Sequence, residues 1–109
     1  DFIYVEDIAR ANILALESNI ENEVFNVGTG KVTSIAELSY KIIDILGADV
    51  KPIFSGKESL VTRRQAGCDK IKNMLGFECK VSLEEGIERC IDWYTSNGYI
   101  LPPQIRTKG

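Results

Sequence analysis

The alternation of short strand-like runs with longer helical patterns is the feature that most constrains this chain. Largely apolar, β-favouring residues occur at 2–5, 23–27 and 51–54, and helical patterns follow these runs. Parallel neighbouring strands need a crossover connection, which is usually a helix, so this order predicts an α/β fold. A parallel sheet commonly has about five or six strands and is buried on both faces. Three strands are too few, and we expect the chain to be the C-terminal part of a larger α/β protein.

Four helices are expected from apolar residues that recur at helical spacing and from signals at the helix ends. The first begins near Asp7, whose carboxylate is expected to cap it. The second and fourth follow the capping boxes at residues 34–37 and 82–85. The third is a short helix over residues 69–75. Glycines mark the expected helix ends, namely Gly47, Gly76 and Gly98.

The charge balance excludes several classes of partner. The 109 residues include 13 Lys and Arg against 16 Asp and Glu, which gives a formal net charge of −3. Such a chain has no overall positive field for nucleic acid or an anionic membrane. Charged residues also interrupt every apolar run well before the roughly 20 residues of a membrane span. The chain opens on Asp1 rather than Met and without a signal leader, so we expect it to come from within a longer gene product.

The cysteines do not point to a metal centre. Cys68, Cys79 and Cys90 have equal spacings, form no CxxC pair, and are accompanied by no histidine. Cys90 falls on the apolar stripe of the fourth expected helix, where a thiol acts as a small hydrophobic group. We therefore expect structural thiols in a reducing cytoplasm, and the absence of histidine also removes every Ser/His/Asp and Cys/His triad.

A glycine-containing turn follows the second strand-like run. The sequence Gly-Thr-Gly-Lys at 28–31 is not a phosphate loop, because Phe25 stands where that motif needs glycine. It matches the dinucleotide fingerprint GxGxxG only in part, because Thr33 replaces the third glycine. A tight turn is the simplest interpretation, although the backbone N–H groups at the start of the following helix could face an anion.

Two adjacent arginines stand in the polar segment before the third expected helix. Guanidinium forks match the oxygens of a diphosphate, so Arg63 and Arg64 are candidates for binding one. The alternative is a pair of solvated surface arginines. These residues are the one place where the sequence carries chemistry that packing does not require.

Several segments together resemble nucleotide-sugar epimerases and dehydratases, which are extended short-chain dehydrogenase/reductases. The resemblance covers nearly the whole chain, and each segment alone is weak. UDP-glucose 4-epimerase is the favoured member, with dTDP-glucose 4,6-dehydratase, UDP-glucuronate decarboxylase and a non-catalytic binding module as alternatives. The segments are DFIYVEDIA at 1–9, FNVGTG at 25–30, TSIAEL at 33–38, RRQA at 63–66 and SLEEGI at 82–87.

This resemblance implies a Rossmann-type fold in which an N-terminal part, outside this chain, binds NAD. The family's catalytic Tyr-x-x-x-Lys pair is also missing, because Tyr40 is followed at the Lys position by Asp44 and Tyr94 by Gly98. The chain is therefore expected to be inactive alone, although the whole protein would be an enzyme. Such an enzyme would oxidise the sugar at C4 transiently and regenerate its cofactor.

The resemblance also implies a role for this part of the protein. Residues 1–98 would supply the last sheet strand and most of the substrate domain, and residues 99–109 a C-terminal tail. Arg64, or else Arg63, would clamp the diphosphate of a UDP- or dTDP-hexose, with Asn26 as a further phosphate contact. The whole protein is expected to be a cytoplasmic homodimer. The sugar and the base are not determined by the sequence.

Overall fold

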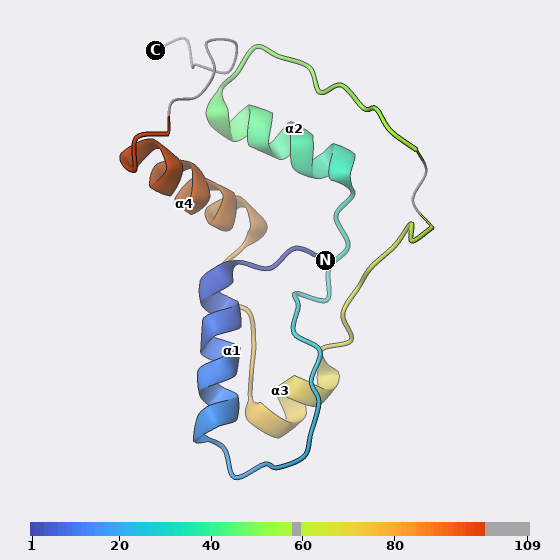
Figure 1. The fold of residues 1–109 in the computed structure, drawn as a ribbon, viewed down its shortest axis with the longest axis vertical. Helices are drawn as coiled ribbons and strands as arrows, with labels where there is room; N and C mark the ends of the chain where they lie inside the picture. Colours follow the sequence, from blue (N-terminus) through green and yellow to red (C-terminus); the bar gives the residue numbers. More distant parts are fainter. Residues whose placement is uncertain (58–59, 100–109) are drawn as a thin grey trace. The chain divides into compact units, whose positions relative to one another are not determined.

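A computed structural model describes residues 1–57 and 60–99 of the chain, and all four expected helices are present (Figure 1). They are α1 (Val5–Glu17), α2 (Ile35–Leu46), α3 (Asp69–Leu75) and α4 (Leu83–Ser96). The chain divides into two compact units, each built from two separate stretches. Unit 1 comprises Asp1–Val32 and Val61–Leu83, and unit 2 comprises Thr33–Leu60 and Glu84–Gly109.

The ends of α2 and α3 confirm the signals seen in the sequence. Ser34 Oγ accepts the backbone N–H of Glu37 at 3.1 Å, and Glu37 Oε2 accepts the N–H of Ser34 at 2.7 Å. This reciprocal capping box satisfies two donors that a helix start leaves free. Gly47 and Gly76 end α2 and α3 in the left-handed region, with φ of 59° and 66°. Glycine adopts this conformation without a steric penalty.

The core of unit 1 lies between α1 and α3, which are side by side (Figure 1). Ala11 of α1, Ile71 of α3 and Phe77 form its buried centre. Ala11 lies on the apolar face of α1 and Ile71 on that of α3, and Phe77 follows the turn that ends α3. The partly buried residues packed against this centre are Ile3, Leu14, Phe25, Val27, Cys68, Leu75 and Cys79.

The strand expected at residues 23–27 is not formed, although its side chains alternate as a strand's would. Phe25 and Val27 pack on the core, whereas Val24 is 82% exposed and Asn26 is exposed. Alternation is a local property, but a strand also needs a hydrogen-bonded neighbour. Within residues 1–57 and 60–99 no strand is present to pair with this segment. The side chains therefore alternate as in a strand, but the segment is not part of a sheet.

The other two expected strands are also wrong for the described residues. Residues 2–4 form an irregular lead into α1, which takes Val5 as its first residue. Residues 51–54 are irregular too, with Ile53 92% exposed and Phe54 59% exposed. Their β-favouring composition reflects side-chain fit to a sheet, and it cannot create the sheet partner. The α/β expectation is therefore not confirmed for this chain, whose described residues form helices and irregular segments but no strand.

Unit 2 contains α2 and the greater part of α4. Leu46 and Ile87 are its buried apolar residues, and Lys41 of α2 forms an ion pair with Glu84 of α4. Cys90, expected on the apolar stripe of α4, is instead exposed. Trp93 and Tyr94 of α4 are 55% and 50% exposed, so the described residues leave part of the apolar side of this helix uncovered. The expected tail falls outside the described residues, apart from Tyr99.

Candidate functional site

The carboxylate of Asp1 is the centre of a hydrogen-bonded cluster in unit 1. Its Oδ1 accepts the backbone N–H and the hydroxyl of Thr29 at 2.8 and 2.6 Å. Its Oδ2 accepts the N–H of Gly30 at 2.9 Å and of Ala66 at 3.2 Å. The backbone nitrogen of Asp1 donates to the carbonyl oxygen of Arg64 at 2.9 Å. One residue thus ties the glycine turn to the arginine segment, and we call this arrangement the Asp1 cluster.

The N–H groups of the glycine turn point at a carboxylate of the chain itself. Consecutive N–H groups of Thr29 and Gly30 converge on Asp1, as such groups do on a bound anion. Gly28 is needed for a different reason, which is space. A Cβ atom there would lie 2.6 Å from the Cβ of Ala66 and 2.7 Å from Oδ2 of Asp1. The turn is therefore filled by protein atoms.

The two candidate arginines are exposed, and they differ in their surroundings. Arg63 Nη2 donates to Oε1 of Gln65 at 3.1 Å, and Gln65 Nε2 donates to the Gly30 carbonyl at 2.6 Å. Arg64 is held by its backbone carbonyl in the Asp1 cluster while its side chain is exposed. The structure therefore places the backbone segment that carries both arginines beside the glycine turn. Asn26 is exposed two residues before that turn and is not a member of the Asp1 cluster.

A second anchored carboxylate, Asp7, is 2% exposed on the first turn of α1. It accepts the N–H groups of Lys80 and Val81 at 3.0–3.1 Å and a bond from Arg10 Nη2 at 2.7 Å. Burial opposes ionisation of Asp7, but the bonds from Arg10, Val81 and Lys80 outweigh it and lower the pKa of the carboxyl. The expected capping residue therefore holds the segment before α4, while the cap position of α1 is Tyr4.

Each of the two units has a hollow that is lined by described residues. The hollow in unit 1 has a volume of about 270 Å³. It lies beside the glycine turn and is lined by Gly28, Thr29, Cys68, Asp69, Lys72, Phe77, Glu78 and Cys79. Lys72 and Glu78 form an ion pair of 2.7 Å, which raises the pKa of Lys72 and lowers that of Glu78. Polar groups therefore converge in this hollow.

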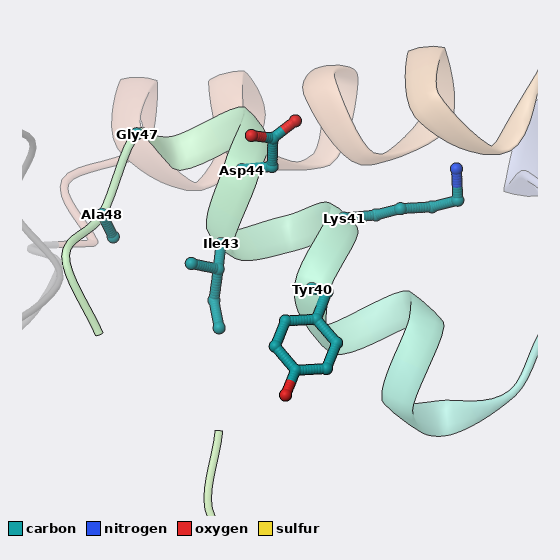
Figure 2. Close-up of a pocket in the computed structure, with 6 residues that line it drawn as sticks. All are labelled: Tyr40, Lys41, Ile43, Asp44, Gly47 and Ala48. Carbon is teal, nitrogen blue, oxygen red and sulfur yellow. The ribbon is translucent and has the colours of Figure 1, made fainter. Parts of the chain in front are cut away.

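The hollow in unit 2 lies on α2 and measures about 500 Å³. Figure 2 shows Tyr40 and Ile43 on the same side of the helix, with Lys41 and Asp44 directed elsewhere. Lys41 is already paired with Glu84, so the hollow offers little beyond an apolar surface. Specific small-molecule sites need a few polar groups that converge on the ligand. We therefore assign the candidate site to unit 1.

Sequence reasoning identified the arginines and the turn but missed the Asp1 cluster. Asp1 lies 28 residues from Thr29 and 65 residues from Ala66. No local pattern reveals bonds over such separations. The sequence analysis expected anion-facing N–H groups at the start of the following helix, whereas those that meet Asp1 belong to Thr29, Gly30 and Ala66.

Comparisons with known proteins find relatives that are named as nucleotide-sugar enzymes. The chain is 39% identical over 98 residues to a "Putative UDP-glucose 4-epimerase" of Methanocaldococcus jannaschii. It is 32% identical over 101 residues to a UDP-glucuronate 4-epimerase of Thermodesulfobacterium geofontis. It is 27% identical over 100 residues to a UDP-N-acetyl-alpha-D-glucosaminuronate decarboxylase of Bacillus cytotoxicus. These matches cover 85–89% of this chain but only 30–31% of each relative.

The chain is thus similar to one part of nucleotide-sugar epimerases and decarboxylases, in agreement with the resemblance of its sequence motifs. It corresponds to the C-terminal part of these proteins and spans about a third of their length. No protein-family model and no solved structure matches it. Among the described residues, no helix is long and apolar enough to cross a membrane.

Proposed function

We propose that the chain is the nucleotide-binding part of an NAD-dependent nucleotide-sugar epimerase of the UDP-glucose 4-epimerase kind. The names of these relatives support action on a UDP-sugar, and two of the three are 4-epimerases by name. In this proposal the chain binds the nucleotide diphosphate of the sugar. The rest of the protein supplies the catalytic groups, and the whole acts as a cytoplasmic homodimer.

One observation carries the assignment of the diphosphate to Arg64. The carbonyl of Arg64 accepts a hydrogen bond from the backbone nitrogen of Asp1. The N–H of Ala66, two residues later, donates to the carboxylate of the same aspartate. The backbone on both sides of Gln65 is therefore anchored, while the Arg64 guanidinium remains exposed. An anchored backbone reduces the conformational entropy that is lost when a long side chain binds a ligand. Arg63, which already has Gln65 as a partner, is the second candidate, and Asn26 is a third.

NAD is not assigned to this chain. A dinucleotide needs free N–H groups at a glycine turn to bind its pyrophosphate. In this chain the N–H groups of Thr29 and Gly30 already donate to Asp1, and a Cβ-sized space beside Gly28 is filled. The residues present do not fit the cofactor, which supports its assignment to the rest of the protein.

A decarboxylase is the second candidate function, because one relative carries that name. A dehydratase and a non-catalytic binding module are the further alternatives. All but the last would use the same arginine for the same diphosphate, so binding studies do not separate the enzymes. Product analysis with UDP-glucose, dTDP-glucose and UDP-glucuronate separates them, since each enzyme converts one substrate in a characteristic way.

The binding proposal is tested by calorimetric titration of UDP-glucose into the whole protein that contains this chain. Arg64→Ala should weaken binding roughly tenfold or more, because charge-assisted hydrogen bonds to a phosphate are lost. Arg64→Lys should recover only part of the affinity, since an ammonium cannot form a bidentate fork. NAD affinity should be unchanged in both variants.

Arg63→Ala is the matched control, because it removes the same charge one residue away. It should retain most of the affinity for UDP-glucose. Loss of affinity in Arg63→Ala with retention in Arg64→Ala would move the assignment to the neighbouring residue. Retention in both variants would overturn the diphosphate assignment and leave a solvated pair of arginines.

A further inference from the structure

Two thiols share one hydrogen-bond acceptor in unit 1. Cys68 Sγ donates to the carbonyl oxygen of Gly28 at 3.3 Å, and Cys79 Sγ donates to the same oxygen at 3.2 Å. Because both distances run to the same oxygen, the separation of the two sulfur atoms cannot exceed their sum. A carbonyl oxygen has two lone pairs and can accept both bonds. The arrangement therefore holds the two thiols together although ten residues separate them.

The backbone between the two cysteines explains their proximity. Cys68 is the cap residue before α3, and the helix ends at Gly76 in the left-handed conformation. That turn reverses the chain, so Phe77 returns to the core next to Ile71. Cys79 thereby comes back to the end of α3 at which Cys68 stands. A bond between Cys68 and Cys79 would close a loop that consists of α3 and the turn after it, and both belong to the packed unit 1.

Both thiols are also open to a small reagent. They are only partly buried, and both line the hollow of about 270 Å³ beside the glycine turn. The third cysteine, Cys90, lies on α4 and is exposed. Hollow, proximity and a shared acceptor distinguish the first two thiols from the third. The proposed binding of a diphosphate rests on Arg64 and uses neither thiol.

We infer that Cys68 and Cys79 form a redox-active thiol pair, which a low-molecular-weight disulfide converts into an intramolecular disulfide. The Cys68 thiolate attacks one sulfur of the reagent, forms a mixed disulfide and releases one reagent thiol. Cys79 then loses its proton and attacks the Cys68 sulfur, which breaks the mixed disulfide and releases the second reagent thiol. Two protein thiols are oxidised and one reagent disulfide is reduced.

The order of attack follows from the surroundings of Cys79. Burial and the nearby charge of Asp7 raise the pKa of the Cys79 thiol, which lowers its thiolate fraction. Cys79 is therefore the resolving thiol. Oxidation removes both S–H donors from the Gly28 carbonyl, which belongs to a buried residue packed against Asp1. The N–H signals of Thr29 and Gly30 should report this change.

The spacing of the cysteines provides an internal control. The Cys68–Cys79 and Cys79–Cys90 pairs have the same sequence separation, so chain entropy alone favours neither. The experiment treats the chain with 2-hydroxyethyl disulfide, folded or in concentrated urea, and maps the products by mass after trypsin cleavage. The relevant peptides are 65–70, 73–80 and 90–106.

In the folded chain the linked peptides 65–70 and 73–80 should exceed the linked peptides 73–80 and 90–106 by about tenfold or more, because the shared acceptor holds the first pair in proximity. In urea the two products should form in comparable amounts. Cys90→Ser should leave the first product unchanged, and Cys79→Ser should stop at a mixed disulfide on Cys68. Comparable amounts in the folded chain, or mixed disulfides alone on all three cysteines, would overturn the inference.

Discussion

Asp1 and Gly28 are packed so closely that a Cβ atom on Gly28 would lie 2.7 Å from Oδ2 of Asp1. Gly28→Ala is expected to lower the free energy of unfolding of the chain by about 1–3 kcal/mol, because overpacking forces the backbone to shift. Asp1 also anchors Gly30 and Ala66, so the shift would reach the arginine segment. Urea unfolding followed by circular dichroism measures the change.

Gly67→Ala is the matched control, because a Cβ atom on Gly67 would meet nothing within 4 Å. This variant should unfold at the same urea concentration or slightly above it, since alanine restricts the unfolded chain. Equal destabilisation by both variants would mean that the Asp1 contact does not limit the size of residue 28.

Removing the charge of Asp7 should destabilise unit 1. The carboxylate is buried and accepts bonds from Arg10, Lys80 and Val81. Asp7→Asn replaces one acceptor oxygen by a donor, and the expected loss is about 1.5–3 kcal/mol per charge-assisted bond that is broken. Glu17→Gln, at the exposed last position of α1, should leave the unfolding free energy nearly unchanged.

The same carboxyl should make stability depend on pH. The pKa of Asp7 is lowered in the folded chain from its ordinary value of 3.8. The unfolded state therefore binds the proton more readily than the folded state. The contribution of Asp7 to the unfolding free energy is complete above pH 3.8 and declines as the pH falls towards the lower native pKa. The difference in unfolding free energy between the unaltered chain and Asp7→Asn should be constant near neutral pH and shrink below 3.8. A difference that grows on acidification would contradict the assignment.

The capping box of α2 should be separable from an ordinary serine on the same helix. Ser34→Ala removes the acceptor for the Glu37 N–H and should cost about 1 kcal/mol. Ser39→Ala removes a hydroxyl that donates to the Ile35 carbonyl inside the helix, where alanine is the better helix former. Thermal unfolding should therefore occur at a lower temperature only for Ser34→Ala. Two equal shifts would argue that the capping box does not stabilise α2.

The 109-residue chain alone should neither convert UDP-glucose nor bind NAD tightly. It contains no tyrosine followed four residues later by lysine, and the N–H groups of its glycine turn donate to Asp1. Product analysis and titration with NADH test the two parts separately, and the whole protein serves as the positive control. Turnover by the isolated chain would contradict its proposed role as the nucleotide-binding part of an enzyme.

The helices could be predicted from the sequence because their signals are local. The pattern of Ser34, Glu37 and Gly47 lies within α2 and its caps, so neighbouring residues alone determine where the helix begins and ends. The alternation of exposed and packed side chains at 24–27 is also local, and the structure contains it. A strand, however, requires a pairing partner from elsewhere, and no residue within the alternation carries that information.

The site shows the same division between local and distant information. Arg63 and Arg64 could be singled out by residue type, and the glycine turn by its motif. The Asp1 cluster could not, because it joins residues 28 to 65 positions apart. Asp7 illustrates both cases, since its place in the first turn of α1 was expected but its bonds to Lys80 and Val81 were not.

The two units are interleaved along the chain, and this determines the order in which they can form during synthesis. Residues 33–60 are an insertion between the two halves of unit 1. Once Leu83 has left the ribosome, every residue of unit 1 is available, whereas α2 must wait for α4 to follow. Vectorial synthesis therefore lets the Asp1 cluster and the arginine segment assemble first. During that interval the apolar side of α2 is the surface that a nascent-chain chaperone would meet.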